Sequence, residues 1–532
     1  MSYKFFTSRK QTPQSQPIAG RKAEMVKGRS GGYHFDPGMW TMLKRCLLIG
    51  TAQSTFYADK HELTGEFTQV VNQCVAADPA RVAKEIAYAS DGHAINNSAP
   101  IYALTLLSMG DSPDAKRAFI EIFPKVIRTG SHFYEWLSYS KALRGFGKVV
   151  RECGTAWLSN TNVKALAYQL LKYQQRHGFT NRDVLRLFHV KPATVEHQAL
   201  YNWVVKGWDV LPKEAPAKSL EQIWWYEWLK RNPSQTKVAI AAGRLTHEMV
   251  APIGEMDEGA WKLLMQDMPI GALLRNLGSL TEIGVLRAHY NKQLKYVASV
   301  LNDRNRLRKG RIHPIDVLKA LKTYQSGGKL GRSKKTWNVI PRIVDILEKA
   351  LEMSFETIPA TGKTFLHAVD VSGSMSYYNV SSVNLTCAEI ATVMALVSAK
   401  AEKNYAIRGF STSFKDLGIM ASDSFQSAME KTTNQNFGGT DASCAYKWAI
   451  KHKFWADVIC FWTDCESWAG TQPSQALEKY RRKVNPDVKA VYVTLAPYKL
   501  SLVDPKDPNS WDLGGFDPSM PRIIQAIANG DL

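Results

Sequence analysis

The chain has 532 residues, of which 45% are hydrophobic and 22% are charged, so its composition is that of a soluble folded protein and excludes a disordered or fibrous one. At about 100–200 residues per domain, this length predicts about two to four domains. The formal net charge is +20, and residues 361–532 contain 17 Lys and Arg against 17 Asp and Glu, so the first 360 residues carry the entire excess.

A membrane-spanning helix is also excluded, because no stretch of about 18 apolar residues occurs in the sequence. Residues 1–30 contain basic side chains but no apolar signal segment, so we expect a loosely ordered N-terminal tail and a cytoplasmic protein. The seven cysteines are odd in number and form no Cys-x-x-Cys pair, which favours reduced thiols in a reducing compartment.

Residues 31–358 follow a helical pattern nearly throughout, with apolar positions three and four apart. In the segment 162–172, one predicted face carries Val163, Leu166, Ala167, Leu170 and Leu171. Further helices are predicted around 116–123, 219–230, 259–267, 270–277, 315–324 and 344–353. No fixed-period repeat is present, so we expect irregular helical pairs stacked side by side, with a compact helical bundle as the alternative.

The positive charge of this helical part attracts polyanions, of which nucleic acid is the commonest. The most informative basic segment runs from Lys172 to Pro192. Lys172 and Arg176 are four residues apart and are predicted to project from one helix face. Thr180 reads as the N-cap of a second helix, on which Arg182, Arg186 and His189 follow at spacings of four and three, as the sequence shows.

Cations on two neighbouring helices, with aromatic residues among them, are suited to hold phosphates and to stack unpaired bases. The alternative is that these charges are solvated helix faces and the aromatic side chains belong to the core. Spacing alone does not separate the two interpretations.

From residue 362 to 532 the pattern changes to short apolar runs that alternate with helical stretches. Strands are predicted at 364–369, 405–410, 458–462 and 488–495, and helices at 382–400, 442–451 and 473–483. This alternation is typical of a doubly wound α/β domain with a parallel sheet covered on both faces. The fold class expected is therefore multidomain, with an all-α repeat domain followed by an α/β domain.

Oxygen ligands gather where two of these strands end. Asp370, Ser372 and Ser374 follow the first strand, Thr440 lies in a Gly-rich loop, and Asp464 follows an apolar strand. Ligands of such sheets collect beyond the carboxyl ends of the strands, and hydroxyls with carboxylates suit a hard cation, with Mg²⁺ the best candidate. The alternative is a helix cap and turn. His367 and Glu466 complete no recognisable catalytic constellation, so no catalytic residue is assigned.

This set of residues resembles the metal-ion-dependent adhesion site of von Willebrand factor A domains. The resemblance implies that Ser372, Ser374 and Thr440 contact the metal and that Asp370 and Asp464 act largely through water. It also implies an open coordination position for an acidic group of an unidentified ligand.

Longer segments resemble the Ro autoantigen family, in which a TROVE domain precedes an A domain, and its bacterial members in particular. The segments are KYQQRHGFTNRDVLRLFHVKP (172–192), DMPIGALLRNLG (267–278), RIHPIDVLKALKTYQSG (311–327) and TGKTFLHAVDVSGSMS (361–376). The resemblance implies a ring of HEAT-like repeats that the A domain helps to close, and a monomer.

The same resemblance implies a noncatalytic protein of RNA quality control and stress response. It implies that small noncoding Y RNA binds the outer surface, with Lys172, Arg176 and His189 in contact. Single-stranded 3′ ends of misfolded or structured RNA are implied to enter the central hole, and a polynucleotide phosphorylase-like exoribonuclease is the implied protein partner. Arg182 and Arg186 are added from the basic pattern. Two alternatives remain open, a metal-dependent adhesion scaffold that docks on an acidic protein complex and a metal-dependent nuclease.

Overall fold

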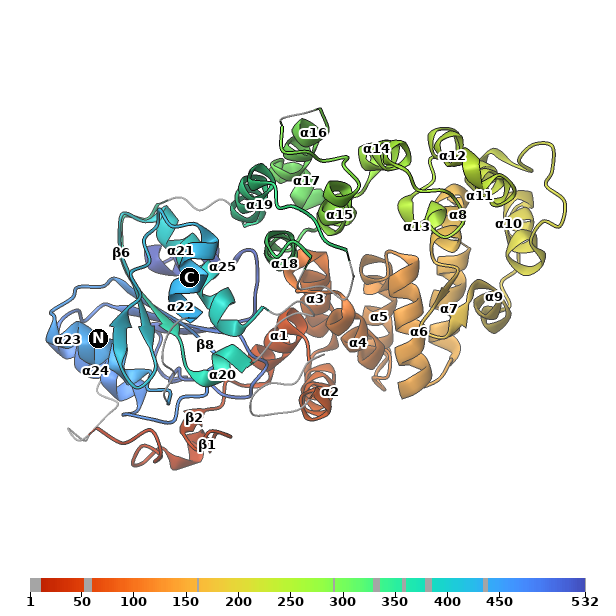
Figure 1. Cartoon of the computed structure of the whole chain (residues 1–532). Coiled ribbons are helices and arrows are strands. Elements are labelled where there is room, and N and C mark those ends of the chain that lie inside the picture. The colour runs from red at the N-terminus through yellow and green to blue at the C-terminus, as the bar shows by residue number, and fades with distance from the viewer. Residues whose placement is uncertain are drawn as a thin grey trace.

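The computed structural model describes residues 11–51, 60–159, 162–289, 292–328, 335–355, 360–377, 385–433 and 439–531. A helical domain and a sheet-containing domain lie side by side (Figure 1). This arrangement confirms the predicted order of an all-α domain followed by an α/β domain. None of the helices described is long and apolar enough to cross a bilayer.

The N-terminal segment differs from the predicted loose tail. Residues 1–10 lie outside the described residues, but residues 11–30 pack on the sheet domain through a 3₁₀ turn and a strand. That strand, β1 (Met25–Lys27), pairs antiparallel with β2 (Tyr33–Phe35). The turn is Lys22–Glu24. The prediction was wrong for this part, because the partners that hold a polar segment lie hundreds of residues away.

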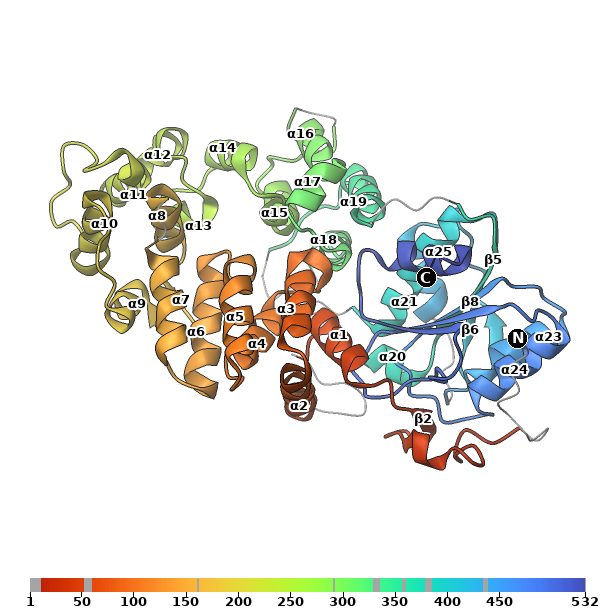
Figure 2. The same ribbon diagram turned by 180° about the vertical axis from the view of Figure 1, so that it is seen from behind.

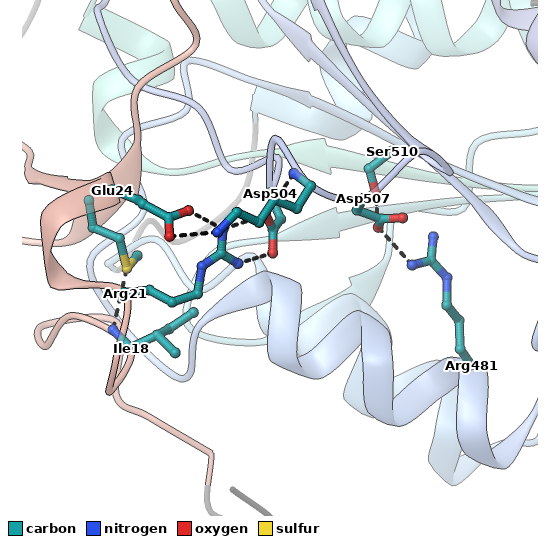
Figure 3. Close-up of polar contacts among 9 residues, drawn as sticks. Ile18, Arg21, Glu24, Arg481, Asp504, Asp507 and Ser510 are labelled. Atoms are coloured by element: carbon teal, nitrogen blue, oxygen red, sulfur yellow. Dashed lines mark hydrogen bonds and ion pairs between the residues drawn. The ribbon is translucent and has the colours of Figure 1, made fainter. Parts of the chain in front are cut away.

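Arg21 is the main anchor of the N-terminal segment (Figure 3). Its guanidinium donates to Asp504 Oδ1 at 2.8 Å and to Glu24 Oε2 at 2.7 Å, and it lies over the Phe35 ring. Ile18, Met25 and Phe35 form a small apolar cluster beneath the segment. In the same view, Arg481 and Asp507 form a second ion pair at 2.7 Å, which fixes the loop that carries Asp504.

The helical domain consists of short helices that pack on the next helix or on the next but one along the chain. The first half contains α1 (Met39–Ile49), α2 (Lys60–Ala77), α3 (Pro79–Tyr88), α4 (Ser98–Leu107), α5 (Pro113–Val126), α6 (Gly130–Leu143), α7 (Lys148–Leu158), α8 (Val163–Lys172) and α9 (Asn181–Phe188). The second half contains α10 (Val195–Lys206), α11 (Glu221–Arg231), α12 (Thr236–Gly243), α13 (His247–Val250), α14 (Glu258–Asp267), α15 (Ile270–Glu282), α16 (Lys292–Leu301), α17 (Arg304–Lys309), α18 (Pro314–Gln325) and α19 (Pro341–Ser354).

Helix α8 shows how the sequence pattern produces this packing. Asn162 caps its N-terminus, because the Asn162 side chain accepts a hydrogen bond from the Ala165 amide at 3.0 Å. The five apolar residues predicted to share a face are all buried in the structure, namely Val163, Leu166, Ala167, Leu170 and Leu171. A helix with one apolar stripe needs a neighbour to cover it, which explains why the helices stack in sequence.

The helices follow an arc that returns on itself (Figures 1 and 2). Helices α9 and α10 lie at the end farthest from the sheet domain, whereas α18 lies beside α1 and α3. Ile49 of α1 and Ile95, which lies before α4, belong to the same apolar cluster as residues of α15 and α18. The side chain of Arg311 donates to Asp91 at 2.7 Å across this junction.

The sheet domain takes part in the junction. Its Asp517 carboxylate accepts a hydrogen bond from Tyr88 at 2.6 Å and contacts His93 Nδ1 at 2.9 Å. The Phe516 carbonyl accepts from His313 Nε2. His313 Nδ1 accepts from the Ile315 amide at 3.1 Å, so the neutral ring carries its proton on Nε2. Both ends of the arc are therefore hydrogen-bonded to one loop of the sheet domain.

The sheet has six strands in the order β10-β9-β8-β5-β6-β7. All neighbouring pairs are parallel except β6 and β7, which are antiparallel. The strands are β5 (Thr364–Asp370), β6 (Asn404–Phe410), β7 (Phe414–Asp416), β8 (Val458–Thr463), β9 (Lys489–Thr494) and β10 (Ser510–Gly514). The four predicted strands are confirmed, and the sequence analysis missed the short edge strands β7 and β10.

Helices cover both faces of this sheet, as a doubly wound fold requires. One face carries α20 (Gly373–Tyr377), α21 (Cys387–Ala401), α22 (Phe425–Thr433) and α25 (Met520–Asn529), and the other carries α23 (Ser443–Lys451) and α24 (Pro473–Lys483). In β5, Phe365 and Val369 face the first layer, whereas Leu366 and Ala368 face the second. All seven cysteines are free and buried, in agreement with reduced thiols.

Arg45 of α1 joins the two domains. Its side chain is fully buried and donates to the carbonyls of Tyr498 at 2.8 Å and Leu500 at 2.6 Å, and its other nitrogen pairs with Asp512. Gly514 lies directly against this side chain, because a Cβ at that position would be 2.2 Å from Arg45 Cγ. A buried cation is costly unless its charge is paired. Here β10 supplies Asp512 and the loop before it supplies the two carbonyls, while Nε has no partner among the described residues.

We predict that Arg45→Ala lowers the free energy of unfolding by about 3–5 kcal/mol, because it leaves Asp512 and two carbonyl oxygens buried without their donor. Urea denaturation followed by tryptophan fluorescence measures this loss. Lys44→Ala is the matched control, since Lys44 is half exposed and pairs with Glu85 at 3.5 Å. The control is expected to lose less than about 1 kcal/mol, and an equal loss in both variants would contradict the role of Arg45.

Candidate functional site

The predicted oxygen ligands meet at one edge of the sheet. Asp370 is the last residue of β5, and Asp464 follows the end of the neighbouring strand β8. The crossover after β5 leads to β6 on one side of it, and the connection after β7 returns to β8 on the other side. This is the topological switch point at which ligands bind in such sheets. Ser372 and Ser374 come from the turn that begins α20.

Short hydrogen bonds hold these side chains in place. Asp370 Oδ1 accepts from the Ser372 amide at 2.9 Å, and Asp370 Oδ2 accepts from Thr463 Oγ1 at 2.6 Å. The two serine hydroxyl oxygens are 3.2 Å apart, and the Ser374 side chain also hydrogen-bonds Asp464. The sequence analysis missed Thr463, which orients the Asp370 carboxylate. In the sequence, the only sign of this role is its position directly before Asp464.

Thr440 reaches the same place from a loop. Its carbonyl accepts hydrogen bonds from Ser467 Oγ at 3.0 Å and from the amides of Trp468 and Ala469 at 3.1 and 3.0 Å. Its hydroxyl is buried and has no hydrogen-bond partner among the described residues. Phe437 and Gly438, from the predicted Gly-rich loop, lie outside the described residues. A buried hydroxyl without a partner is costly unless a ligand completes it.

The electrostatics of the cluster favour a cation. All five predicted ligands are buried, namely Asp370, Ser372, Ser374, Thr440 and Asp464. Burial raises the pKa of Asp370, and the neighbouring Asp464 charge raises it further. Burial likewise raises the pKa of Asp464. Two carboxylates that repel each other in a dry site are stabilised by a positive charge between them. The hydroxyls and carboxylates present thus fit a hard divalent cation.

Glu466 extends this site toward the N-terminal segment. Its Oε2 accepts from Ser30 Oγ at 2.6 Å and from the Ser30 amide at 3.1 Å, whereas its Oε1 is buried without a partner among the described residues. Burial raises the pKa of Glu466 to about 7. Arg29 next to Ser30 pairs with Glu62 at 2.6 Å, on helix α2. The segment around Ser30 therefore connects the rim of the cluster to the helical domain.

The raised pKa of Asp370 predicts a pH dependence. A carboxyl whose pKa is higher in the folded state contributes stability below its unfolded pKa, near 4, and loses it as the pH rises through the folded value. We therefore predict that raising the pH from 5 to 8 in a chelator lowers the free energy of unfolding of the metal-free protein by about 1–3 kcal/mol more than that of Asp370→Asn. Urea denaturation at both pH values measures the difference.

At pH 8, added Mg²⁺ is expected to raise the melting temperature of the unmodified chain but not that of Asp370→Asn. Asp487→Asn changes an exposed carboxylate in the same domain and is the matched control. Identical pH profiles for all three proteins would contradict this account.

The basic segment adopts a different structure from the one predicted. Helix α8 ends at Lys172, and Arg176 lies in a short strand, β3 (Gln175–Arg176), that pairs with β4 (Phe179–Thr180). His177 and Gly178 form the two-residue turn between them, both with positive φ, at 49° and 79°. Lys172 and Arg176 therefore do not share a helix face, and that prediction was wrong. The sequence signal that could have predicted this hairpin is the His177-Gly178 pair, since glycine favours such two-residue turns.

Lys172 is largely buried, with 11% of its side chain exposed. It lies over the rings of Tyr168 and Tyr173 and pairs with Glu248 of α13 at 3.4 Å. Burial opposes its charge, but these three neighbours outweigh the effect and raise the pKa of the Lys172 ammonium. The structure thus places Lys172 in a packing role between α8 and α13.

Four of the predicted residues do lie on the surface. Arg176, Arg182, Arg186 and His189 are exposed, on the β3–β4 hairpin and on α9. Thr180 caps α9 as predicted, since its hydroxyl accepts from the Asp183 amide at 3.2 Å and Asp183 accepts from the Thr180 amide at 2.9 Å. His189 ends the helix in the left-handed conformation, with φ 48°. We call these four residues the hairpin–α9 surface.

We predict that Lys172→Ala lowers the free energy of unfolding by about 1–2 kcal/mol, because it leaves Glu248 half-buried without its partner. Arg176→Ala, on the exposed hairpin, is the control and is expected to change stability by less than about 0.5 kcal/mol. Differential scanning calorimetry measures the stability of the two variants against that of the unmodified chain. A neutral Lys172→Ala would show that this residue is free to serve as a surface contact.

Comparison with known proteins agrees with the two-domain architecture. Residues 26–232 and 246–336 match the TROVE domain, and residues 364–528 match the Ro60 vWA domain. The RNA-binding protein RO60 of Deinococcus radiodurans is 32% identical over 98% of both chains. The protein of the same name from Caenorhabditis elegans is 26% identical, covering 96% of this chain and 91% of its own.

A solved structure is similar over most of the chain. The crystal structure of the Deinococcus radiodurans RO (RSR) protein has a TM-score of 0.69 and 31% sequence identity, and the match covers 93% of this chain and 100% of that one. The match spans both the helical arc and the sheet domain.

Proposed function

This chain belongs to the Ro60 family, and on that premise we propose that it is an RNA-binding protein without catalytic activity of its own. The observation that carries the proposal is the hairpin–α9 surface, where three arginines and a histidine lie exposed on a domain that holds the entire excess of positive charge. Arginine forms charge-assisted hydrogen bonds with phosphate oxygens, so such a surface attracts an RNA backbone. The names of its relatives support the same class of ligand.

The specific RNAs follow from the family resemblance. We propose that a small noncoding Y RNA binds the hairpin–α9 surface, and that single-stranded 3′ ends of misfolded or structured RNAs enter the ring of helices. Proteins recognise folded RNA mainly by its shape, its phosphates and its unpaired ends. In this proposal the chain presents RNA to an exoribonuclease, acts as a monomer and works in RNA quality control in the cytoplasm.

The cluster at the edge of the sheet is proposed to hold Mg²⁺. Ser372, Ser374 and Thr440 would bind the ion directly, while Asp370 and Asp464 would act largely through water. The buried Thr440 hydroxyl without a partner supports this assignment. The bound ion would supply an open coordination position for an acidic group of a partner. Because the sheet domain has no net charge, the ion and not an excess of basic side chains would attract this acidic group.

We expect an Arg176→Ala/Arg182→Ala/Arg186→Ala variant to bind structured RNA at least about tenfold more weakly at 0.1 M salt, because it loses three phosphate contacts. The slope of log affinity against log salt is expected to become less steep by about 0.7 for each lost contact to a single strand. Filter binding with a labelled RNA that carries a single-stranded 3′ tail measures both. His189→Ala tests the histidine separately.

Lys451→Ala/Lys453→Ala/Lys483→Ala removes the same charge from exposed positions of the sheet domain and is the matched control. Arg182 donates to the Val205 carbonyl, so the melting temperature of each variant is measured alongside. Binding that both triple variants weaken equally would mean that total charge, and not this surface, determines affinity. Cleavage of the RNA in Mg²⁺ that Asp464→Ala abolishes would replace the proposal with a nuclease.

A second function, a metal-dependent adhesion scaffold, is favoured by one observation. Trp468 lies at the rim of the cluster, beside the loop of Thr440, and the residue is 43% exposed. Exposed aromatic residues are enriched where proteins bind one another. RNA binding that survives Asp370→Ala but not the arginine triple variant would keep the two functions on separate domains.

A further inference from the structure

A cavity of about 470 Å³ lies between helices α15 and α18. Its walls come from the segments 267–278 and 311–327, which carry part of the family resemblance and play no role in the two sites above. Ser279, Gly328, Lys335 and Trp337 complete the lining. A volume of this size, between about 300 and 1,000 Å³, is that of a small-molecule site. Both helices lie where the arc of the helical domain returns to its start (Figure 1).

One wall of the cavity is flat and aromatic. The Trp337 indole packs on Gly278, where a Cβ would be 2.6 Å from the ring, so the glycine is needed for this approach. The indole nitrogen donates to the Tyr324 carbonyl at 2.9 Å, and the two rings are stacked with centroids 6.0 Å apart. These contacts hold a planar surface in a fixed orientation, which suits stacking with a planar ligand.

Among the described residues, three cations and one carboxylate, that of Asp316, line the cavity, and Lys335 also lies 4.0 Å from Glu282. Arg275 is exposed, and the Lys319 side chain is 23% exposed and lies 3.9 Å from Asp316. Lys335 donates to Ser279 Oγ at 3.1 Å. Burial lowers the pKa of Lys319, and a partly dehydrated ammonium of this kind interacts strongly with an anion.

A ligand that fits must combine a planar group with a negative charge. We propose that this cavity binds one nucleotide, with its phosphate between Arg275 and Lys319 and its base against the Trp337 wall. An unpaired nucleotide of RNA and a free nucleoside monophosphate share this chemistry. If the ligand is an unpaired nucleotide of RNA, the proposal rests on the RNA-binding function proposed above. If it is a free nucleotide, the proposal is independent of that function.

Adenosine 5′-monophosphate is the first probe, titrated into the full chain by calorimetry. Arg275→Ala/Lys319→Ala is expected to bind it at least about tenfold more weakly, because two charge-assisted contacts are lost. Ala320→Met keeps both cations but fills the cavity, and the same loss is expected. Arg308→Ala/Lys309→Ala removes two exposed cations from α17 and is the matched control, with unchanged affinity expected.

Adenosine without phosphate and ribose 5-phosphate without a base are each expected to bind more weakly than the monophosphate. Melting temperatures establish that each variant is folded. Equal affinity of the monophosphate for all variants, or no binding to the unmodified chain, would overturn the proposal.

A short single-stranded RNA with 4-thiouridine at its 3′ end identifies the source of the nucleotide. A photo-crosslink to the peptides of α15 or α18 assigns the cavity to RNA, and competition by the monophosphate confirms the shared site. Monophosphate binding without such a crosslink assigns it to a free nucleotide. The arginine triple variant of the hairpin–α9 surface is expected to keep its affinity for the monophosphate. The proposed RNA surface and the proposed nucleotide cavity can therefore be disproved separately.

Discussion

The carboxylate of Asp517 is the point on which the arrangement of the two domains depends. It accepts hydrogen bonds from Tyr88, from the Ser519 amide at 2.8 Å and from Ser519 Oγ at 2.7 Å, and it contacts His93. The preceding residue, Phe516, accepts a hydrogen bond from His313 at the other end of the helical arc. One loop of the sheet domain thus holds the end of α3 and the start of α18, which lie at the two ends of the arc, and its Phe516 belongs to the apolar cluster that spans both domains.

The two proposed binding regions share this framework but differ in their physical basis. The hairpin–α9 surface consists of exposed cations, whose attraction for phosphate acts over distance and weakens with salt. The cluster at Asp370 is buried, so its attraction for a cation depends on dehydrated oxygen atoms at fixed positions. The segment around Ser30 contacts both domains, since Ser30 bonds Glu466 and Arg29 pairs with Glu62.

Local patterns in the sequence predicted the parts of the fold that local forces determine. The alternation of strands and helices, the apolar face of α8 and the cap at Thr180 all depend on residues within a few positions of one another. The positions of Asp370 and Asp464 followed from the rule that parallel strands end at one edge. Long-range partners determined the rest. Lys172 is buried against Glu248 of another helix, and Arg21 holds the segment 11–30 through Asp504, which lies 483 residues later. Neither contact can be predicted from neighbouring residues.

The N-terminal anchor has a consequence for synthesis. Arg21 and Asp504 are 483 residues apart in sequence. A ribosome that adds about 5–20 residues per second needs about 25–100 seconds to make the intervening chain. During that interval Ile18, Met25 and Phe35, which form a buried cluster in the finished protein, lack the sheet domain on which their segment packs. This segment thus leaves the ribosome long before its partners and takes its final place only after the sheet domain has been made.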